Sequence, residues 1–243
     1  MLKTLVCSAV AFAAMALAAS ASHAAPMVFF GENQTPGGSV SGAPLSARTA
    51  FLSNLTGVVS QGFESFAFGT AGPLALSFTG SGAPLTATLS GSGRIENRTD
   101  AGRFNTTSGG SKWWDTSSDF IIDFASGSEI SAFGFYGTDI GDFDGQVTVT
   151  LTNVNNISTT LTVASTVNAS NASLLFWGFV DAGNSYTRIR FGNTNAATDF
   201  FGFDDMVIGA QRQVVNPTPE PASLALVGLA LLGLAAIRRN KRV

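Results

Sequence analysis

Apolar side chains recur at every second position through most of the middle of the chain. A two-residue period places successive side chains on opposite faces of a strand, so that one face is buried and the other is in water. The segment Leu174–Val180 is apolar on both faces, which predicts a central strand or one covered by another element. The alternating apolar positions that predict the other strands are Phe120, Ile122 and Phe124; Phe133 and Phe135; Val147, Val149 and Leu151; Leu161 and Val163; Ile189 and Phe191.

Glycine and asparagine clusters separate these segments and predict turns. Gly91–Gly93 is one such cluster, and Asn155-Asn156 lies between two alternating runs as in a hairpin. The segment Pro44–Leu55 departs from this period, because its apolar residues have helical spacing. The pattern therefore predicts an all-β fold, namely an antiparallel two-sheet β-sandwich of jelly-roll type, with one short helix that closes an end.

The first residues have the pattern of a secretory signal peptide. Lys3 supplies the positive charge, Leu5–Ala18 is an apolar stretch too short to span a membrane easily, and Ser22-His23-Ala24 places small residues before a cleavage point. We therefore expect residues 1–24 to be removed and the mature chain to begin at Ala25.

This cleavage would remove the only cysteine and the only histidine, Cys7 and His23. The mature chain would then have no cysteine or histidine nucleophile, no zinc site of the Cys/His type, no histidine-ligated haem and no disulfide. We therefore expect the body to be held together by its hydrophobic core alone.

Between Ala25 and Asn216 the chain has 15 acidic and eight basic residues, a net charge of −7. An acidic surface argues against nucleic acid as a partner and against tight binding to anionic lipid. It is compatible with neutral glycans and favours divalent cations.

The C-terminal end combines three ordered features: Pro219-Glu220-Pro221, the apolar run Ala222–Ile237 and the basic cluster Arg238–Arg242. Two prolines so close together keep the chain out of a helix before the apolar run. As a helix the 16-residue run would be about 24 Å long, shorter than a hydrocarbon core of about 30 Å. Bilayer thinning or snorkelling of the arginines would close that gap, and the basic cluster would lie in the cytoplasm.

This tail resembles the PEP-CTERM sorting signal of Gram-negative bacteria that make exopolysaccharide. The resemblance rests on the sorting motif Pro219, Glu220 and Pro221, on the apolar run, and on the basic end that begins with Arg238 and Arg239. It implies that an exosortase recognises the tail, cuts near it, and releases or re-attaches the protein. The precursor would be anchored in the inner membrane with its body in the periplasm, and the product would be at the cell surface or extracellular.

The expected organisation is a signal peptide at 1–24, a β-sandwich at 25–210, a linker at 211–218 and the sorting segment at 219–243. The body also resembles a recurrent cargo type among PEP-CTERM proteins, which is similar in outline to glycan-binding β-sandwiches. Five short motifs carry this second resemblance: Ala47–Phe51, Gly62–Phe66, Gly102–Thr107, Phe133–Gly141 and Phe201–Asp205.

Trp113-Trp114 is the first candidate for a binding site. In an extended segment the two rings point to opposite sides, so one could enter the core while the other stacks on a sugar. Arg103 and Asn105 lie close in sequence and could bond sugar hydroxyls. The alternative is that both rings fill one end of the sandwich.

Asp139, Asp142 and Asp144 form the second candidate, because they place three carboxylates in one glycine-containing turn. Oxygen ligands suit Ca²⁺, so the turn predicts a structural calcium site, although its spacing is not that of an EF-hand. The alternative is a solvated turn, with Asp204 or Asp205 bonded to backbone amides.

Three functions follow. The first is an exported, non-enzymatic surface or matrix protein, sorted by exosortase and associated with exopolysaccharide. The second is a lectin-like carbohydrate-binding module. The third is a glycoside-active enzyme, which would need two carboxylates from a set such as Glu64, Glu96 and Glu129 to meet in a cleft.

Overall fold

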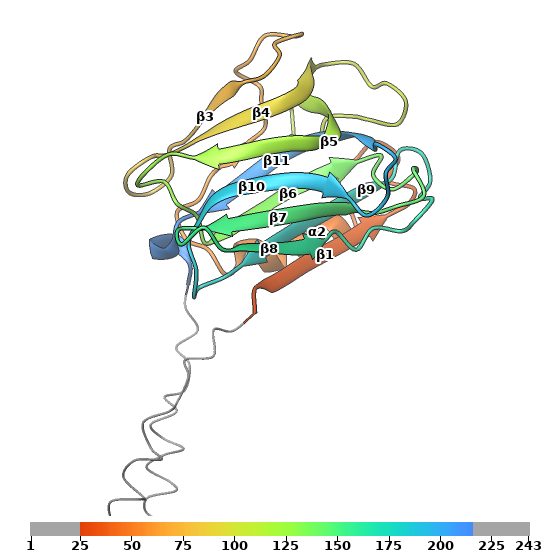
Figure 1. Cartoon of the computed structure of the whole chain (residues 1–243). Coiled ribbons are helices and arrows are strands. Elements are labelled where there is room, and N and C mark those ends of the chain that lie inside the picture. The colour runs from red at the N-terminus through yellow and green to blue at the C-terminus, as the bar shows by residue number, and fades with distance from the viewer. Residues whose placement is uncertain (1–24, 216–243) are drawn as a thin grey trace, which may run out of the picture.

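The computed structural model describes residues 25–215. Figure 1 shows a strongly curved sheet with one α-helix against its outer face. In chain order the elements are β1 (Met27–Asn33), α2 (Ala43–Leu52), β2 (Ser60–Gln61), β3 (Leu74–Phe78), β4 (Leu85–Glu96), β5 (Trp113–Phe124), β6 (Ala132–Thr138), β7 (Val147–Asn153), β8 (Ser158–Thr162), β9 (Leu174–Val180), β10 (Tyr186–Asn193), β11 (Phe200–Gly209) and the 3₁₀-helix η2 (Gln211–Gln213).

All eleven strands belong to one antiparallel hydrogen-bonded sheet, with the order β1-β9-β6-β11-β5-β10-β7-β8. β4 lies along β5 with β3 beside it, and β2 pairs with β11. The prediction of a mostly β, antiparallel fold is confirmed. The two separate sheets of a sandwich are not confirmed, because hydrogen bonds continue from β11 through β5 to β10. The sheet instead curls into a half-barrel, with β5, β10 and β7 in front of β11, β6 and β9 (Figure 1).

Strand β5 joins the two halves of the curl. Its first half, from Trp114 to Ser117, pairs with β11, whereas Ile121–Asp123 pair with β10. β4 follows β5 around this bend through a register shift between Gly91 and Gly93. A side chain at Gly91 would lie 2.5 Å from the Cβ of Phe120, so the bulge requires glycine. The prediction of a turn at Gly91–Gly93 is therefore wrong, since the cluster marks a bulge inside a twelve-residue strand.

The concave side of the curl holds the main hydrophobic core, in which phenylalanines from facing halves meet. Phe191 of β10 contacts Phe135 of β6, with ring centroids 5.5 Å apart, and stacks on Phe120 of β5 at 4.1 Å. Offset and edge-to-face aromatic pairs of this kind stabilise a core beyond the area that they bury. The alternating apolar positions that predicted the strands are thus the positions that face this core.

A second hydrophobic cluster lies between α2 and the outer face of β6 and β9. Phe51 of α2 packs on Phe176 of β9, with ring centroids 5.5 Å apart, and Phe176 packs on Tyr136 of β6 at 5.4 Å. Residue Trp177, next along β9, faces the concave core instead. This arrangement confirms the predicted helix and explains why Leu174–Val180 is apolar on both faces. The helix does not close an end of a sandwich, as predicted, because it covers the outer face of β6 and β9.

The start of the expected linker packs on the body. Thr56 donates its amide to the carbonyl of Gln213 at 2.8 Å, and Val214 forms a β-bridge with Leu55. The body therefore extends to residue 215. No helix between residues 25 and 215 is long and apolar enough to cross a membrane. The predicted signal peptide and the predicted membrane helix of the tail both lie outside the described residues.

Candidate functional site

The five motifs found in the sequence converge on one region. The loop between β4 and β5, residues 97–112, lies over the outer face of β5, β11 and β6. The amide of Phe104 donates to Thr138 Oγ1 of β6 at 3.3 Å, and Thr106 bonds Asp204 of β11. The motifs Gly102–Thr107, Phe133–Gly141 and Phe201–Asp205, far apart in the chain, are therefore in direct contact.

Asp204 is the centre of this contact, and it is completely buried. Its Oδ2 accepts the amide of Thr106 at 2.7 Å, the hydroxyl of Thr106 at 3.0 Å and the amide of Thr107 at 3.2 Å. Burial and the neighbouring carboxylate of Asp205 raise the pKa of Asp204 to about 8, against the opposing effect of these donors. The expectation that Asp204 or Asp205 bonds backbone amides is confirmed, and the pair fixes the loop to the sheet.

The other motifs complete the same region. Glu64 accepts the amides of Ser111 and Lys112 at 2.9 and 2.8 Å, so Gly62–Phe66 fixes the far end of the loop. Arg48 of Ala47–Phe51 lies over the ring of Tyr136, 5.6 Å from its centroid. The motifs are thus a structural unit that supports the surface around the loop.

A groove of about 530 Å³ opens at this surface, where β4, β5 and β11 run side by side. Arg94 of β4 and Asp115 of β5 are direct cross-strand partners in it. Phe200, the first residue of β11, forms part of its wall, and its side chain is 58% exposed. The remaining lining residues are Gly69, Ala71, Ser92, Gly93, Arg103, Thr116 and Ser117.

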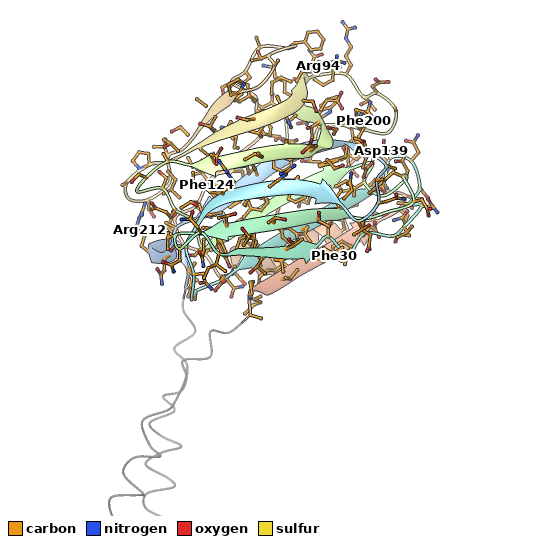
Figure 2. All side chains as sticks on the ribbon, in the orientation of Figure 1. Phe30, Arg94, Phe124, Asp139, Phe200 and Arg212 are labelled. Atoms are coloured by element: carbon orange, nitrogen blue, oxygen red, sulfur yellow. The ribbon has the colours of Figure 1, made fainter. Side chains whose placement is uncertain are left out.

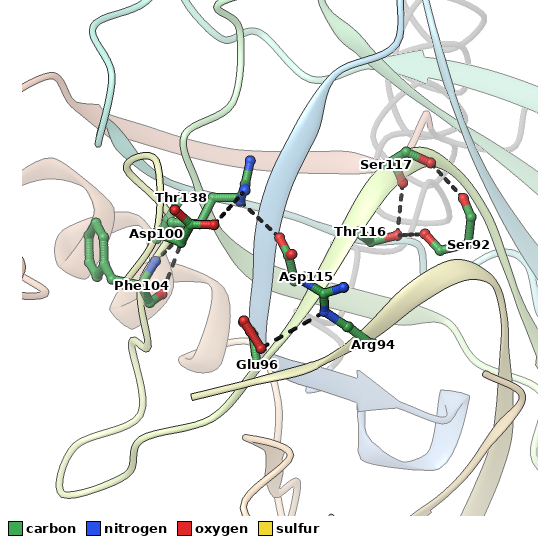
Figure 3. A network of polar contacts seen from close by, with 10 residues as sticks. Ser92, Arg94, Glu96, Asp100, Phe104, Asp115, Thr116, Ser117 and Thr138 are labelled. Atoms are coloured by element: carbon green, nitrogen blue, oxygen red, sulfur yellow. Dashed lines mark hydrogen bonds and ion pairs between the residues drawn. The ribbon is translucent and has the colours of Figure 1, made fainter. Parts of the chain in front are cut away.

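Ion pairs hold the charged side of the groove (Figure 3). Arg103 Nε lies 2.8 Å from Asp115 Oδ1, and both side chains are mostly buried. Burial raises the pKa of Asp115, while Arg103 and Arg94 act in the opposite direction. Arg94 is different, because its Nε is 3.9 Å from Glu96 Oε1 and its side chain is 58% exposed.

Hydroxyl groups form the other side of the groove. Ser92 Oγ and Ser117 Oγ are 2.9 Å apart, and Thr116 donates its hydroxyl to the carbonyl of Ser92 at 3.3 Å (Figure 3). Thr116 and Ser117 are buried, so the groove combines an exposed guanidinium, a partly buried carboxylate, the exposed hydroxyl of Ser92 and an open aromatic ring.

The residues expected to form a glycan site are not brought together as one site. Trp113 and Trp114 do point to opposite faces, but they are only 1% and 0% exposed, so neither ring is open for stacking on a sugar. They do not fill one end of the fold together, as the alternative expected, because they lie on opposite faces of the sheet. Trp114 is in the concave core. Trp113 lies with Asn105 beside a separate hollow of about 380 Å³, and Asn105 bonds within its own loop. Of the four residues, only Arg103 lines the groove.

Sequence reasoning did not find Arg94, Asp115 or Phe200. The available signal was weak: Asp115 directly follows two buried tryptophans, and Phe200 is the first of two adjacent phenylalanines that must face opposite sides of a strand. Neither of these two sequence features indicates that Arg94, Asp115 and Phe200 line the same groove.

The acidic turn places its carboxylates in different surroundings. Asp139 is buried and accepts the amide of Ala172 at 2.9 Å, whereas Asp142 and Asp144 are exposed. The buried Asp199 joins them and accepts the amide of Gly141 at 3.0 Å. Burial, together with the charges of Asp142 and Asp139, raises the pKa of Asp199 to about 7. Within residues 25–215, no three Asp, Glu, His or Cys side chains are grouped so that they could hold a metal ion.

We expect Ca²⁺ to leave the melting temperature unchanged, because the carboxylates of Asp139, Asp142 and Asp144 do not converge. Melting curves in 2 mM CaCl₂ and in NaCl of equal ionic strength would test this. A higher melting temperature in CaCl₂ that disappears in Asp142→Asn would instead establish the calcium site predicted from the sequence, since a ligand that binds only the folded state stabilises it.

The glutamates considered for catalysis come from three different segments, and Glu96 lies beside the groove through its ion pair with Arg94. Glu64 is bonded to the loop between β4 and β5, Glu96 ends β4, and Glu129 bonds the amide of Gly127 in the turn between β5 and β6. None of the three lines the groove, where Asp115 is the only carboxylate among the described residues.

Among the comparisons with known proteins, the match is to the tail. The family model of the PEP-CTERM protein-sorting motif matches residues 217–240. Neither the curated proteins nor the solved structures contain a significant match to the chain. The match covers the rigid motif, the apolar run and the first basic residues that the sequence analysis singled out. The chain therefore carries a PEP-CTERM protein-sorting motif at residues 217–240, as an exported exosortase substrate does.

Proposed function

We propose that this protein is a non-enzymatic component of the cell surface or extracellular matrix that associates with exopolysaccharide. The observation that carries the proposal is the groove between β4, β5 and β11, on a body whose tail has the export motif. Its hydroxyls, guanidinium and carboxylate suit the many hydroxyls of a glycan, and Phe200 offers an apolar surface. The same observation favours the second candidate function, a lectin-like module, as the way in which the body would hold the polysaccharide.

The single carboxylate of the groove supports a binding role over catalysis. Most glycoside hydrolases need two carboxyl groups on either side of the scissile bond. Asp115 is the one carboxylate in the lining and is paired with Arg103 at 2.8 Å. The nearby Glu96 and Asp100 are also in ion pairs, with Arg94 and Arg103. Every carboxylate at the groove is therefore engaged by an arginine, which favours a binding role over acid–base catalysis.

Binding of the body to the host's own exopolysaccharide tests the proposal. Residues 25–215 contain every strand and both hydrophobic clusters, so we expect the chain from Ala25 to Asn216 to fold alone. It should co-sediment with the purified polysaccharide without releasing reducing sugar ends. Absence of binding would remove the association with exopolysaccharide, and reducing ends that disappear in Asp115→Asn would make the protein an enzyme.

Sorting through the tail is tested separately. We expect Glu220→Ala, or deletion of Arg238–Val243, to leave an unprocessed precursor in the inner membrane, because each change removes one of the three ordered features of the tail. Fractionation and immunoblotting of the host would detect the precursor. Release equal to that of the unaltered chain would show that these residues are dispensable for sorting.

A further inference from the structure

We infer that the groove binds a neutral pyranose unit of a polysaccharide, with the sugar ring stacked on Phe200 and its hydroxyls bonded by Arg94 and Asp115. This inference rests on the proposed association with polysaccharide, and it adds the class of sugar and the residues that bind it.

Phe200 is the apolar side of the proposed site. The other nine residues of β11 are buried, so this ring is the one side chain of the strand that is open to water. It is directly opposite Ser117, which also lines the groove. One face of a pyranose ring presents C–H groups, and covering the phenylalanine with that face would remove apolar surface of both from water.

Arg94 and Asp115 are the polar side. A sugar hydroxyl can donate one hydrogen bond and accept others, so adjacent hydroxyls match a donor placed beside an acceptor. The 3.9 Å separation between Arg94 and Glu96 exceeds hydrogen-bond distance, which leaves the guanidinium N–H groups free to donate. Asp115 is held in place by Arg103, so the acceptor is already positioned before a ligand arrives.

The net charge of the groove favours a neutral sugar over an acidic one as the ligand. The ion-pair network at the groove contains two guanidiniums, Arg94 and Arg103, and three carboxylates, Glu96, Asp100 and Asp115. The network is thus negative by one charge, and the body around it is also negative. A uronic acid would be repelled by this field, whereas a neutral hexose would meet no such repulsion.

Two pairs of variants test the residues with matched controls. Phe200→Ala is matched by Phe30→Ala, which removes a partly exposed ring from β1, away from the groove (Figure 2). Arg94→Ala is matched by Arg190→Ala, because the two arginines are similarly exposed, at 58% and 62%, and each lies beside a carboxylate. All four side chains are on the surface, so we expect the variants to melt close to the unaltered protein.

Calorimetric titration would use neutral hexasaccharides of glucose and mannose, with hexagalacturonate as the acidic probe. We expect a neutral probe to bind with an affinity that changes less than twofold between 20 and 500 mM NaCl, because its binding involves no charge pairing. Phe200→Ala and Arg94→Ala should each weaken it at least tenfold, and the two control variants less than twofold.

The inference is overturned by any of three results: no neutral probe binds, hexagalacturonate binds more tightly and loses affinity with salt, or Phe200→Ala and Arg94→Ala bind as tightly as their controls. Failure of the wider proposal looks different. If host exopolysaccharide binds the unaltered protein and these two variants equally, only the groove is wrong; if it binds none of them, the association itself is wrong.

Discussion

Replacing Trp114 with alanine is expected to lower the free energy of unfolding by about 3–5 kcal/mol, the usual cost of removing a buried aromatic ring. The ring is fully buried where β5 pairs with Ile95 of β4 on one side and Phe203 of β11 on the other. A side chain at Gly93 would lie 2.5 Å from the indole, so the surrounding backbone already fits closely around it. For a chain of this size the melting temperature should fall by roughly 10 °C.

Urea and thermal unfolding would measure the effect, with Phe200→Ala as the exposed aromatic control. We expect the control to change the unfolding free energy by less than about 0.5 kcal/mol, as surface substitutions usually do. A loss below about 1 kcal/mol in Trp114→Ala, combined with weaker glycan binding, would mean that the ring is accessible and that the stacking role considered from the sequence is correct.

Stability should rise as the pH is lowered from about 8 toward 4. Asp204 and Asp199 have pKa values of about 8 and about 7 in the folded protein, and burial is the main cause for both. Unfolded aspartates titrate near 3.9, so between these values the folded state binds protons that the unfolded state has released. Their stabilising contribution is full below about pH 4 and is lost as the pH rises through 7 and 8.

Each protonated group contributes about 1.4 kcal/mol for every pH unit in this window. We therefore expect the melting temperature at pH 5.5 to exceed that at pH 8.5 by several degrees. No histidine titrates between about pH 4 and 8 in the body that starts at Ala25, because the one histidine of the chain is His23. Asp199→Asn should flatten the curve below pH 7, whereas Asp123→Asn, which alters an exposed ion pair with Arg188, should leave its shape unchanged. A melting temperature that is constant or rises with pH would show that both carboxyl groups are ionised in the folded protein.

The sequence predicted those parts of the fold in which burial has a simple period. Val147, Val149 and Leu151 alternate because β7 has one face toward the core, and Leu174–Val180 is apolar throughout because α2 covers the other face of β9. The strands β1, β2, β3, β4 and β11 were not predicted. β4 was missed because Gly91 and Gly93, which allow its bulge, look in the sequence like the glycines of a turn.

The groove could not be predicted because it depends on strand register. Arg94 meets Asp115 only because β4 and β5 pair with that offset, and Phe200 joins them from a strand about a hundred residues away in the chain. A slip of one residue would turn each of these side chains to the other face of the sheet. Trp113 and Trp114 are the most unusual residues of β5 in the sequence, but both are buried. The accessible polar groups belong to Asp115, the next residue, and to its cross-strand partner Arg94.

The described body begins and ends on the same side. Met27, at the start of β1, pairs with Val180, and Gln211 of η2 donates its side-chain amide to the carbonyl of Ala182 at 3.0 Å. In Figure 2, Arg94 and Phe200 are at the opposite end from this side. The match to the PEP-CTERM family model begins at residue 217, two residues after the described body ends. The described chain therefore leaves the body on the side opposite the groove, so that a ligand can reach the groove without passing the point where the tail begins.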